Sequence, residues 1–186
     1  MAKVTTGTGD DGFTGLLGVE RVAKYAPIPE LLGAVDEATS ALGLARAFTA
    51  DAEVRELIQH VQRALYTLMA EVATPPEHLD AVGYRTTPEA VAWLESAEAD
   101  LKERVTIPNR FVIPGDTTDG AALDVARTVI RRAERLAVRL WHEGIITNPE
   151  IVRYLNRCSD FAFILARVVE VRAGGSTLAT ENPDGT

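Results

Sequence analysis

The sequence predicts an all-α fold, a bundle of five helices in a single domain over 1–172. Apolar residues recur every three or four positions along separate stretches, which is the spacing of one buried helix face. No stretch alternates apolar and polar residues for long enough to predict a strand. The 186 residues, 46% of them hydrophobic, suffice for one sizeable core.

Apolar spacing and end signals place the five helices. In the stretch from 122 to 140 the apolar residues form one continuous stripe, which includes Val125. Thr87 before Pro88 is a plausible cap for one helix, while Pro149 begins the last one and a Gly-Gly pair after 173 ends it. The expected helices cover 30–48, 51–74, 88–105, 122–140 and 149–172, with loops at 75–86 and 106–118.

The two ends of the chain differ in composition from the helical part. Residues 5–15 contain four glycines and four threonines, so backbone N–H groups and hydroxyls are available to surround an anion. The segment matches neither a Walker A loop nor a dinucleotide fingerprint, and composition alone favours a disordered N-terminus. Residues 173–186 have the composition of a flexible tail.

Charge separates the classes of ligand. A net charge of −8 opposes binding to nucleic acid or to an acidic membrane surface. One short stretch nevertheless concentrates arginine, which favours a small anionic ligand such as a triphosphate. The alternative is a solvated helix face with local ion pairs, as in a purely structural helical oligomer. These arginines are Arg127, Arg131, Arg132, Arg135 and Arg139.

Other features concern the compartment and metals. No apolar stretch approaches the roughly 20 residues that span a bilayer, and residues 1–20 lack the pattern of a secretory signal. Cys158 is the single cysteine, so we expect a reducing cytoplasm and a buried thiol that acts as a small hydrophobe. The three histidines share no ligand spacing with it, so we expect no metal site built from protein ligands.

Polar residues within apolar helices are further candidates. Asn156, Asp160, Phe163 and Arg167 share one face of the last predicted helix. Asn156 could bind a nucleotide through its amide, or it could make a structural hydrogen bond to a neighbouring helix. Asp36 interrupts the first helix in the same way and could belong to an interhelical ion pair.

Several blocks, in order, resemble the PduO-type ATP:cob(I)alamin adenosyltransferases from Thr6 to about Arg167. The strongest block, at 125–135, reads VARTVIRRAER and is similar to the family's V-A-R-T-x-x-R-R-A-E-R. The other blocks are GDDGFTG at 9–15, RVAK at 21–24, GAVDE at 33–37, ATP at 73–75, FVIPG at 111–115 and LNRCSD at 155–160.

The resemblance implies a ferritin-like, cobalamin adenosyltransferase-like bundle that forms a homotrimer. ATP would lie between subunits, held by a Gly/Thr-rich N-terminal strap and by the arginine-rich helix. Asp36 and Arg127 would form an intersubunit pair, and Phe111 would press on the lower face of the corrin. The residues implied for ATP and Mg²⁺ are Thr6, Thr8, Gly9, Asp10, Gly12, Thr14, Lys24, Arg131, Glu134 and Asn156.

The implied reaction transfers the 5′-deoxyadenosyl group of ATP to the cobalt of cob(I)alamin, giving adenosylcobalamin and triphosphate. A reductase and an adenosylcobalamin-dependent enzyme would be partners. The chain departs from the family pattern at Gly7, where a cation is usual, and at Asp116 and Asp124, which add negative charge near the site. A non-catalytic corrinoid or nucleotide carrier or sensor of the same fold is therefore the alternative.

Overall fold

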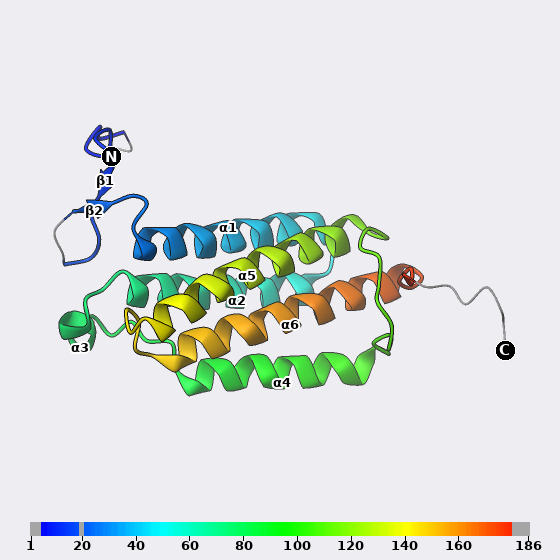
Figure 1. The fold of residues 1–186 in the computed structure, drawn as a ribbon. Helices are drawn as coiled ribbons and strands as arrows, with labels where there is room; N and C mark the ends of the chain where they lie inside the picture. The colour runs from blue at the N-terminus through cyan, green and yellow to red at the C-terminus, as the bar shows by residue number, and fades with distance from the viewer. Residues whose placement is uncertain (1–4, 19–20, 180–186) are drawn as a thin grey trace.

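The computed structural model describes residues 5–18 and 21–179, and within them the predicted helical bundle is confirmed. The helices lie roughly side by side as an elongated bundle (Figure 1). The long helices are α1 (Pro27–Phe48), α2 (Ala52–Val72), α4 (Pro88–Arg104), α5 (Thr118–His142) and α6 (Pro149–Ala173). A 3₁₀ turn, η1 (Pro76–His78), and the short helix α3 (Leu79–Val82) occupy part of the predicted loop at 75–86.

Side-chain caps fix where four of the long helices begin. Asp51 accepts a hydrogen bond from the N–H of Val54 at the start of α2, and Thr87 caps α4 in the same way. Thr117 caps α5 and Asn148 caps α6. Each cap satisfies one of the N–H groups that the first turn of a helix leaves without a partner.

The core lies where α5 packs against both α1 and α6, while α6 also packs against α4 and α1 against α2. Its largest buried apolar side chains include Leu31, Ile58, Leu65, Ile130 and Phe161. Burying each such side chain contributes about 1.5–3 kcal/mol relative to leaving it in water. This packing makes α5 and α6 a rigid base for any site on their surface.

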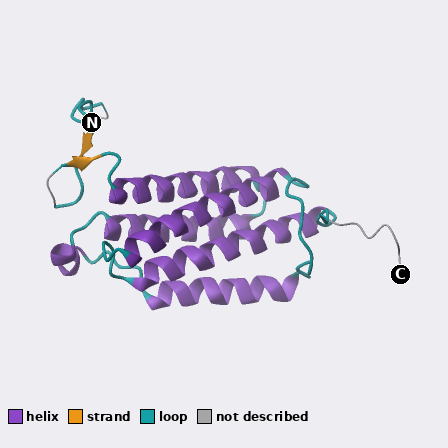
Figure 2. Cartoon of the chain, viewed as in Figure 1, coloured by secondary structure: helices purple, strands orange, loops and turns teal. Residues whose placement is uncertain are grey.

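The N-terminal strap, residues 5–18 and 21–26, leaves the bundle at the end where α1 begins (Figure 2). It contains a two-stranded antiparallel ladder, β1 (Phe13–Thr14) with β2 (Val22–Ala23). The N–H of Leu17 donates to the carbonyl of Ala73 at 3.1 Å, which ties the strap to the end of α2. The sequence did not predict the ladder, because two-residue strands are too short to show an alternating pattern.

The segment after α6 returns to the bundle within the predicted tail. Val112 and Leu178 form an antiparallel bridge, so residues 176–179 lie along the loop that precedes α5 (Figure 1). The rest of the predicted tail, 180–186, lies outside the described residues. Within the described part of the chain, the structure contains no helix with the length and apolar character needed to cross a membrane.

Candidate active site

A groove runs along the packed helices α5 and α6, beside the loop that joins α4 to α5. It consists of two adjoining cavities of about 300 and 650 Å³, and Arg127 and Phe163 line both of them. Arg131 lies in the wall of the smaller cavity, while Phe111 and Arg167 line the larger one. The groove thus brings three of the predicted site residues, Phe111, Arg127 and Arg131, to one surface of a single chain.

Carboxylates of the same chain neutralise only part of the arginine-rich face of α5. Arg132 pairs with Glu37 of α1, and Arg139 pairs with Glu30 at 3.1 Å. Arg131 is exposed, and within residues 5–18 and 21–179 no ion pair involves it. The alternative of local ion pairing therefore describes Arg132 and Arg139, and also Arg127, which pairs with Asp124. Arg131 can instead offer its guanidinium to an anion in the groove.

Glu134 and Asn156 meet across the interface of α5 and α6. The side-chain amide of Asn156 donates to Glu134 Oε1 at 3.0 Å, and Arg157 Nη1 donates to Asn156 Oδ1 at 2.5 Å. The sequence left two roles open for Asn156, and the hydrogen bond to a neighbouring helix is present. A contact with a nucleotide stays a prediction. Both side chains are half-buried, so this polar pair also remains accessible one turn of α5 beyond Arg131.

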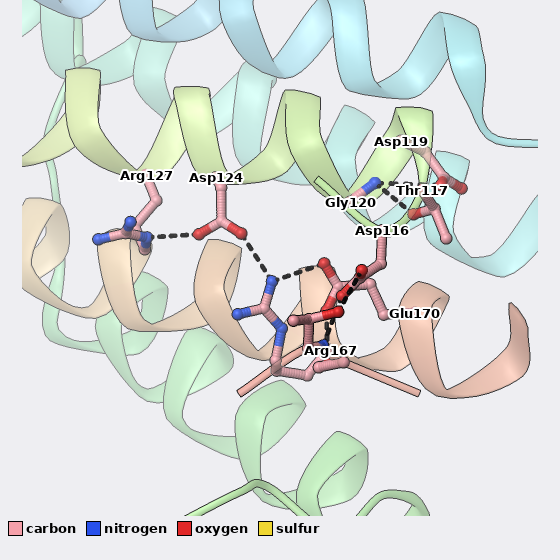
Figure 3. A network of polar contacts seen from close by, with 10 residues as sticks. Asp116, Thr117, Asp119, Gly120, Asp124, Arg127, Arg167 and Glu170 are labelled. Carbon is pink, nitrogen blue, oxygen red and sulfur yellow. Dashed lines mark hydrogen bonds and ion pairs between the residues drawn. The ribbon is translucent and has the colours of Figure 1, made fainter. Parts of the chain in front are cut away.

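A buried charge network supports the larger cavity (Figure 3). Asp124 accepts from Arg127 Nε at 2.8 Å and from Arg167 Nη2 at 2.6 Å, and the same Nη2 donates to Glu170 at 2.9 Å. The Arg167 guanidinium also lies 4.9 Å from the centre of the Phe163 ring, within range of a cation–π interaction. Asp124 therefore brings no uncompensated negative charge into the groove, because two arginines surround it.

Phe111 lies in the loop between α4 and α5, and its side chain projects into solvent. Its side chain is 89% exposed, although it lines a cavity of about 650 Å³. Ile113 in the same loop is 50% exposed, so the loop presents more than one apolar side chain to solvent. The predicted contact of Phe111 with a ligand stays a prediction.

The strap is organised by two cations. Lys24 Nζ donates to the carbonyl of Gly9 at 2.7 Å, and a Cβ on Gly9 would lie only 2.9 Å from that nitrogen. Arg21 binds both carboxylate oxygens of Asp11, at 2.6 and 2.8 Å, and donates to the carbonyl of Phe13 at 3.0 Å. The Arg21 hydrogen bond lowers the pKa of Asp11 below its usual value.

Most other predicted strap residues are exposed. Thr6 and Thr8 hydrogen-bond to each other through their hydroxyls at 2.9 Å, and the N–H of Asp10 donates to the carbonyl of Gly7 at 3.3 Å. The N–H of Gly12, a residue with φ of 84°, donates to the carbonyl of Gly9 at 3.2 Å, while Thr14 lies in β1. These hydroxyls and amides therefore bond to one another within the strap.

The strap and Asp36 lie apart from the groove of the same chain. Asp36 is exposed and lines a separate cavity of about 510 Å³ between α1 and α2, together with Leu17 and Tyr66. No hydrogen bond or ion pair among the described residues joins the strap to Arg131, or Asp36 to Arg127. One chain therefore does not unite all the predicted residues.

Sequence reasoning left several supporting residues without a role. Arg167 and Phe163 were recognised as sharing a face with Asn156, but their contacts with Asp124 and with the cavity were not predicted. Arg21 lies in the family block at 21–24, yet its position in the sequence did not indicate that it holds the strap together by an ion pair with Asp11. Within the described residues, no group of three or more His, Cys, Asp or Glu side chains is arranged to hold a metal ion.

The chain is similar in sequence to known proteins. Residues 4–169 match the family model for cobalamin adenosyltransferase. The chain is 36% identical over 170 residues to the corrinoid adenosyltransferase of Citrobacter freundii, covering 91% of this chain and 96% of that protein. It is 34% identical over 194 residues to the corrinoid adenosyltransferase of Mycobacterium tuberculosis, covering 100% of this chain and 91% of that one.

A solved structure shares the fold as well. It is a variant of the PduO-type ATP:corrinoid adenosyltransferase from Lactobacillus reuteri, complexed with cobalamin and ATP, with a TM-score of 0.86 and 28% identity. The match covers 96% of this chain and 100% of that chain. On these sequence and structural grounds, the chain belongs to the cobalamin adenosyltransferase family.

Proposed function

We propose that the chain is an ATP:cob(I)alamin adenosyltransferase, which forms adenosylcobalamin and triphosphate. The observation that carries this function is the groove, where an exposed phenylalanine lines one cavity and an arginine lines the adjoining one. Among the described residues, this arginine has no carboxylate partner. The relatives are named for this activity, and the related solved structure contains cobalamin and ATP.

The reaction requires the protein to position the two substrates and does not require a general base. Co(I) supplies an electron pair to C5′ of ATP, the Co–C bond forms, and the C5′–O bond breaks with its pair leaving on triphosphate. Aligning the two substrates removes much of the entropic barrier. Phe111, at the rim of the larger cavity, would occupy the lower face of the corrin. An empty lower axial position makes Co(II) easier to reduce to Co(I), with a separate reductase as the electron donor.

The leaving triphosphate needs cations and amide donors. Arg131 would bind it from the groove, beside Glu134 and Asn156, which would contact the nucleotide and its Mg²⁺. In the strap, Gly9, Asp10, Gly12 and Thr14 would wrap the phosphates, with Thr6 and Thr8 adding hydroxyls. Lys24 Nζ would exchange the carbonyl of Gly9 for a phosphate oxygen, since a charged acceptor binds an ammonium group more strongly.

A homotrimer would complete the site. The strap and Asp36 lie away from their own chain's groove, as expected if they serve the groove of a neighbouring copy. In this arrangement Asp36 would pair with Arg127 across the interface, where Arg127 Nε is already held by Asp124 at 2.8 Å. We further propose one domain over 1–172, a cytoplasmic location and handover of the product to an adenosylcobalamin-dependent enzyme.

The direct test is product formation by the full chain with ATP, Mg²⁺ and chemically reduced cobalamin. Arg131→Ala should lower the rate by about 10²–10³-fold, the usual effect of removing one donor to a developing anion. Arg153→Ala is the matched control, because Arg153 is a half-exposed arginine of α6 that pairs with Glu150 of its own helix. A folded wild-type protein that yields no adenosylcobalamin would reject the enzyme.

The second candidate is a non-catalytic carrier or sensor, favoured by Gly7. Gly7 has φ of 71°, a backbone region that glycine adopts readily and that disfavours the lysine or arginine usual in the family. A carrier would bind ATP and cobalamin tightly without forming the Co–C bond. Restored turnover in Gly7→Lys, in a wild-type background that binds without reacting, would identify the lost cation as the cause.

A further inference from the structure

The loop that presents Phe111 receives its backbone partners from the segment that follows α6. The N–H of Ile113 donates to the carbonyl of Thr177 at 2.9 Å, and the N–H of Ala179 donates to the carbonyl of Phe111 at 2.8 Å. Val112 and Leu178 form the antiparallel bridge between these two bonds. We call residues 111–113 the Phe111 strand and residues 176–179 the return strand.

A side-chain clasp holds the two strands together. Both oxygens of Asp116 accept hydrogen bonds from Thr177, one from its N–H at 2.6 Å and one from its hydroxyl at 2.7 Å. These bonds lower the pKa of Asp116 below its usual value, because they favour the ionised carboxylate. Asp116 therefore stays charged at neutral pH and accepts both bonds.

A second set of contacts anchors the return strand to the helices. The hydroxyl of Ser176 donates to Glu170 Oε2 at 2.5 Å, and the other oxygen of Glu170 accepts from Arg167. Arg167 in turn binds Asp124, which holds Arg127 in the groove (Figure 3). The return strand is thus connected through charge-assisted bonds to a residue that lines both cavities.

Arg167, the buried arginine in this set of contacts, has two polar nitrogens whose burial does not favour stability. Arg167 is 0% exposed, yet its Nε and Nη1 have no hydrogen-bond partner among the described residues. Each unsatisfied buried donor costs about 1–3 kcal/mol. Apolar side chains in place of Arg167 and both of its carboxylate partners would avoid this cost.

We propose that Asp116, Thr177 and Ser176 are positioning residues for the corrinoid reaction, which act by fixing the return strand against the Phe111 strand. The phenyl ring extends into solvent, with 89% of its surface exposed, so its own packing does not fix its position. Its backbone instead takes its direction from the bridge and the clasp. This inference rests on the proposed function, because it assigns Phe111 to the corrin.

Asp116→Ala tests the clasp, since it removes both acceptors from an exposed loop without disturbing the core. The KM for the corrinoid should rise about 10- to 100-fold, as expected for the loss of one charge-assisted hydrogen bond, while the KM for ATP stays within about twofold. The four-coordinate fraction in the electronic spectrum of Co(II) cobalamin with ATP should fall. Asp116→Asn, which keeps one acceptor, should restore part of both.

Matched controls separate positioning from folding. Thr177→Val removes only the hydroxyl bond and should give a smaller effect. Thr118→Val, at an exposed threonine in the first turn of α5, should give none. Ser176→Ala should reduce the four-coordinate fraction without changing far-UV circular dichroism. An unchanged corrinoid KM and Co(II) spectrum in Asp116→Ala and Ser176→Ala would overturn the inference while leaving the enzyme intact.

Hydrogen exchange distinguishes failure of this inference from failure of the function. The amides of Ile113 and Ala179 should exchange faster in Asp116→Ala than in the wild type. If the wild type binds corrinoid without turnover, the Co(II) spectrum still decides the role of the clasp. A wild-type protein that neither reacts with nor binds a corrinoid would overturn both proposals.

Discussion

Replacing Arg167 with methionine should lower the free energy of unfolding by up to about 3 kcal/mol. Removing one partner of a buried ion pair costs about 3–5 kcal/mol, because the other charge stays buried. Arg167 serves two such carboxylates, Asp124 at 4% exposure and Glu170 at 0%. Part of the cost is offset, because the variant also removes the two unpaired donors of Arg167.

Urea denaturation followed by far-UV circular dichroism measures this loss, at fixed protein concentration and without substrates. The control is Arg153→Met, at a half-exposed pair with Glu150, which should cost less than about 1 kcal/mol. The double variant Arg167→Met/Glu170→Met should be more stable than the sum of the single variants predicts, by more than about 1 kcal/mol. Equal losses in Arg167→Met and the control, or strict additivity, would refute this reasoning.

Three further changes test the strap, the thiol and the core. Gly9→Ala should weaken ATP binding, measured by calorimetry, because the added Cβ would lie 2.9 Å from Lys24 Nζ and displace that amine. Gly15→Ala is the control and should leave binding unchanged, since no atom lies within 4 Å of its added Cβ. Burial raises the pKa of Cys158, so iodoacetamide should leave the thiol of the folded protein unmodified even at pH 9. The same reagent should alkylate the thiol fully in urea. Rapid alkylation of the folded protein would show that the thiol is accessible. Leu65→Ala, at a buried leucine, should lower the free energy of unfolding by about 2–5 kcal/mol. Leu44→Ala, at a half-exposed leucine, should lower it by less than about 1 kcal/mol. Equal effects would contradict the assigned core.

The sequence was sufficient for the long helices, because their apolar spacing extends over several turns. It was less accurate at details that depend on neighbours. The stripe assigned to the arginine-rich helix included Val125, which is 53% exposed, while Leu123 and Ile130 are buried. The start of α5 lies four residues before the predicted one, because Thr117 caps the helix at Gly120.

The candidate site, like the fold, was predicted only in part from the sequence. Residue types and order were enough to identify Phe111 and Arg131 as site candidates. They could not reveal that Asp124 is neutralised, since Arg167 comes from a different helix. The return strand was likewise hidden, because its pairing joins two irregular segments that show no periodicity.

The bridge between Val112 and Leu178 also sets an order of events during synthesis. The Phe111 loop leaves the ribosome well before the strand that completes it, and α6 lies between them in the sequence. Helices α1, α2 and α5 can begin to dock on one another while that loop still lacks its partner, whereas α4 must wait for α6. A nascent chain therefore assembles only part of its bundle before the surface around Phe111 can be completed.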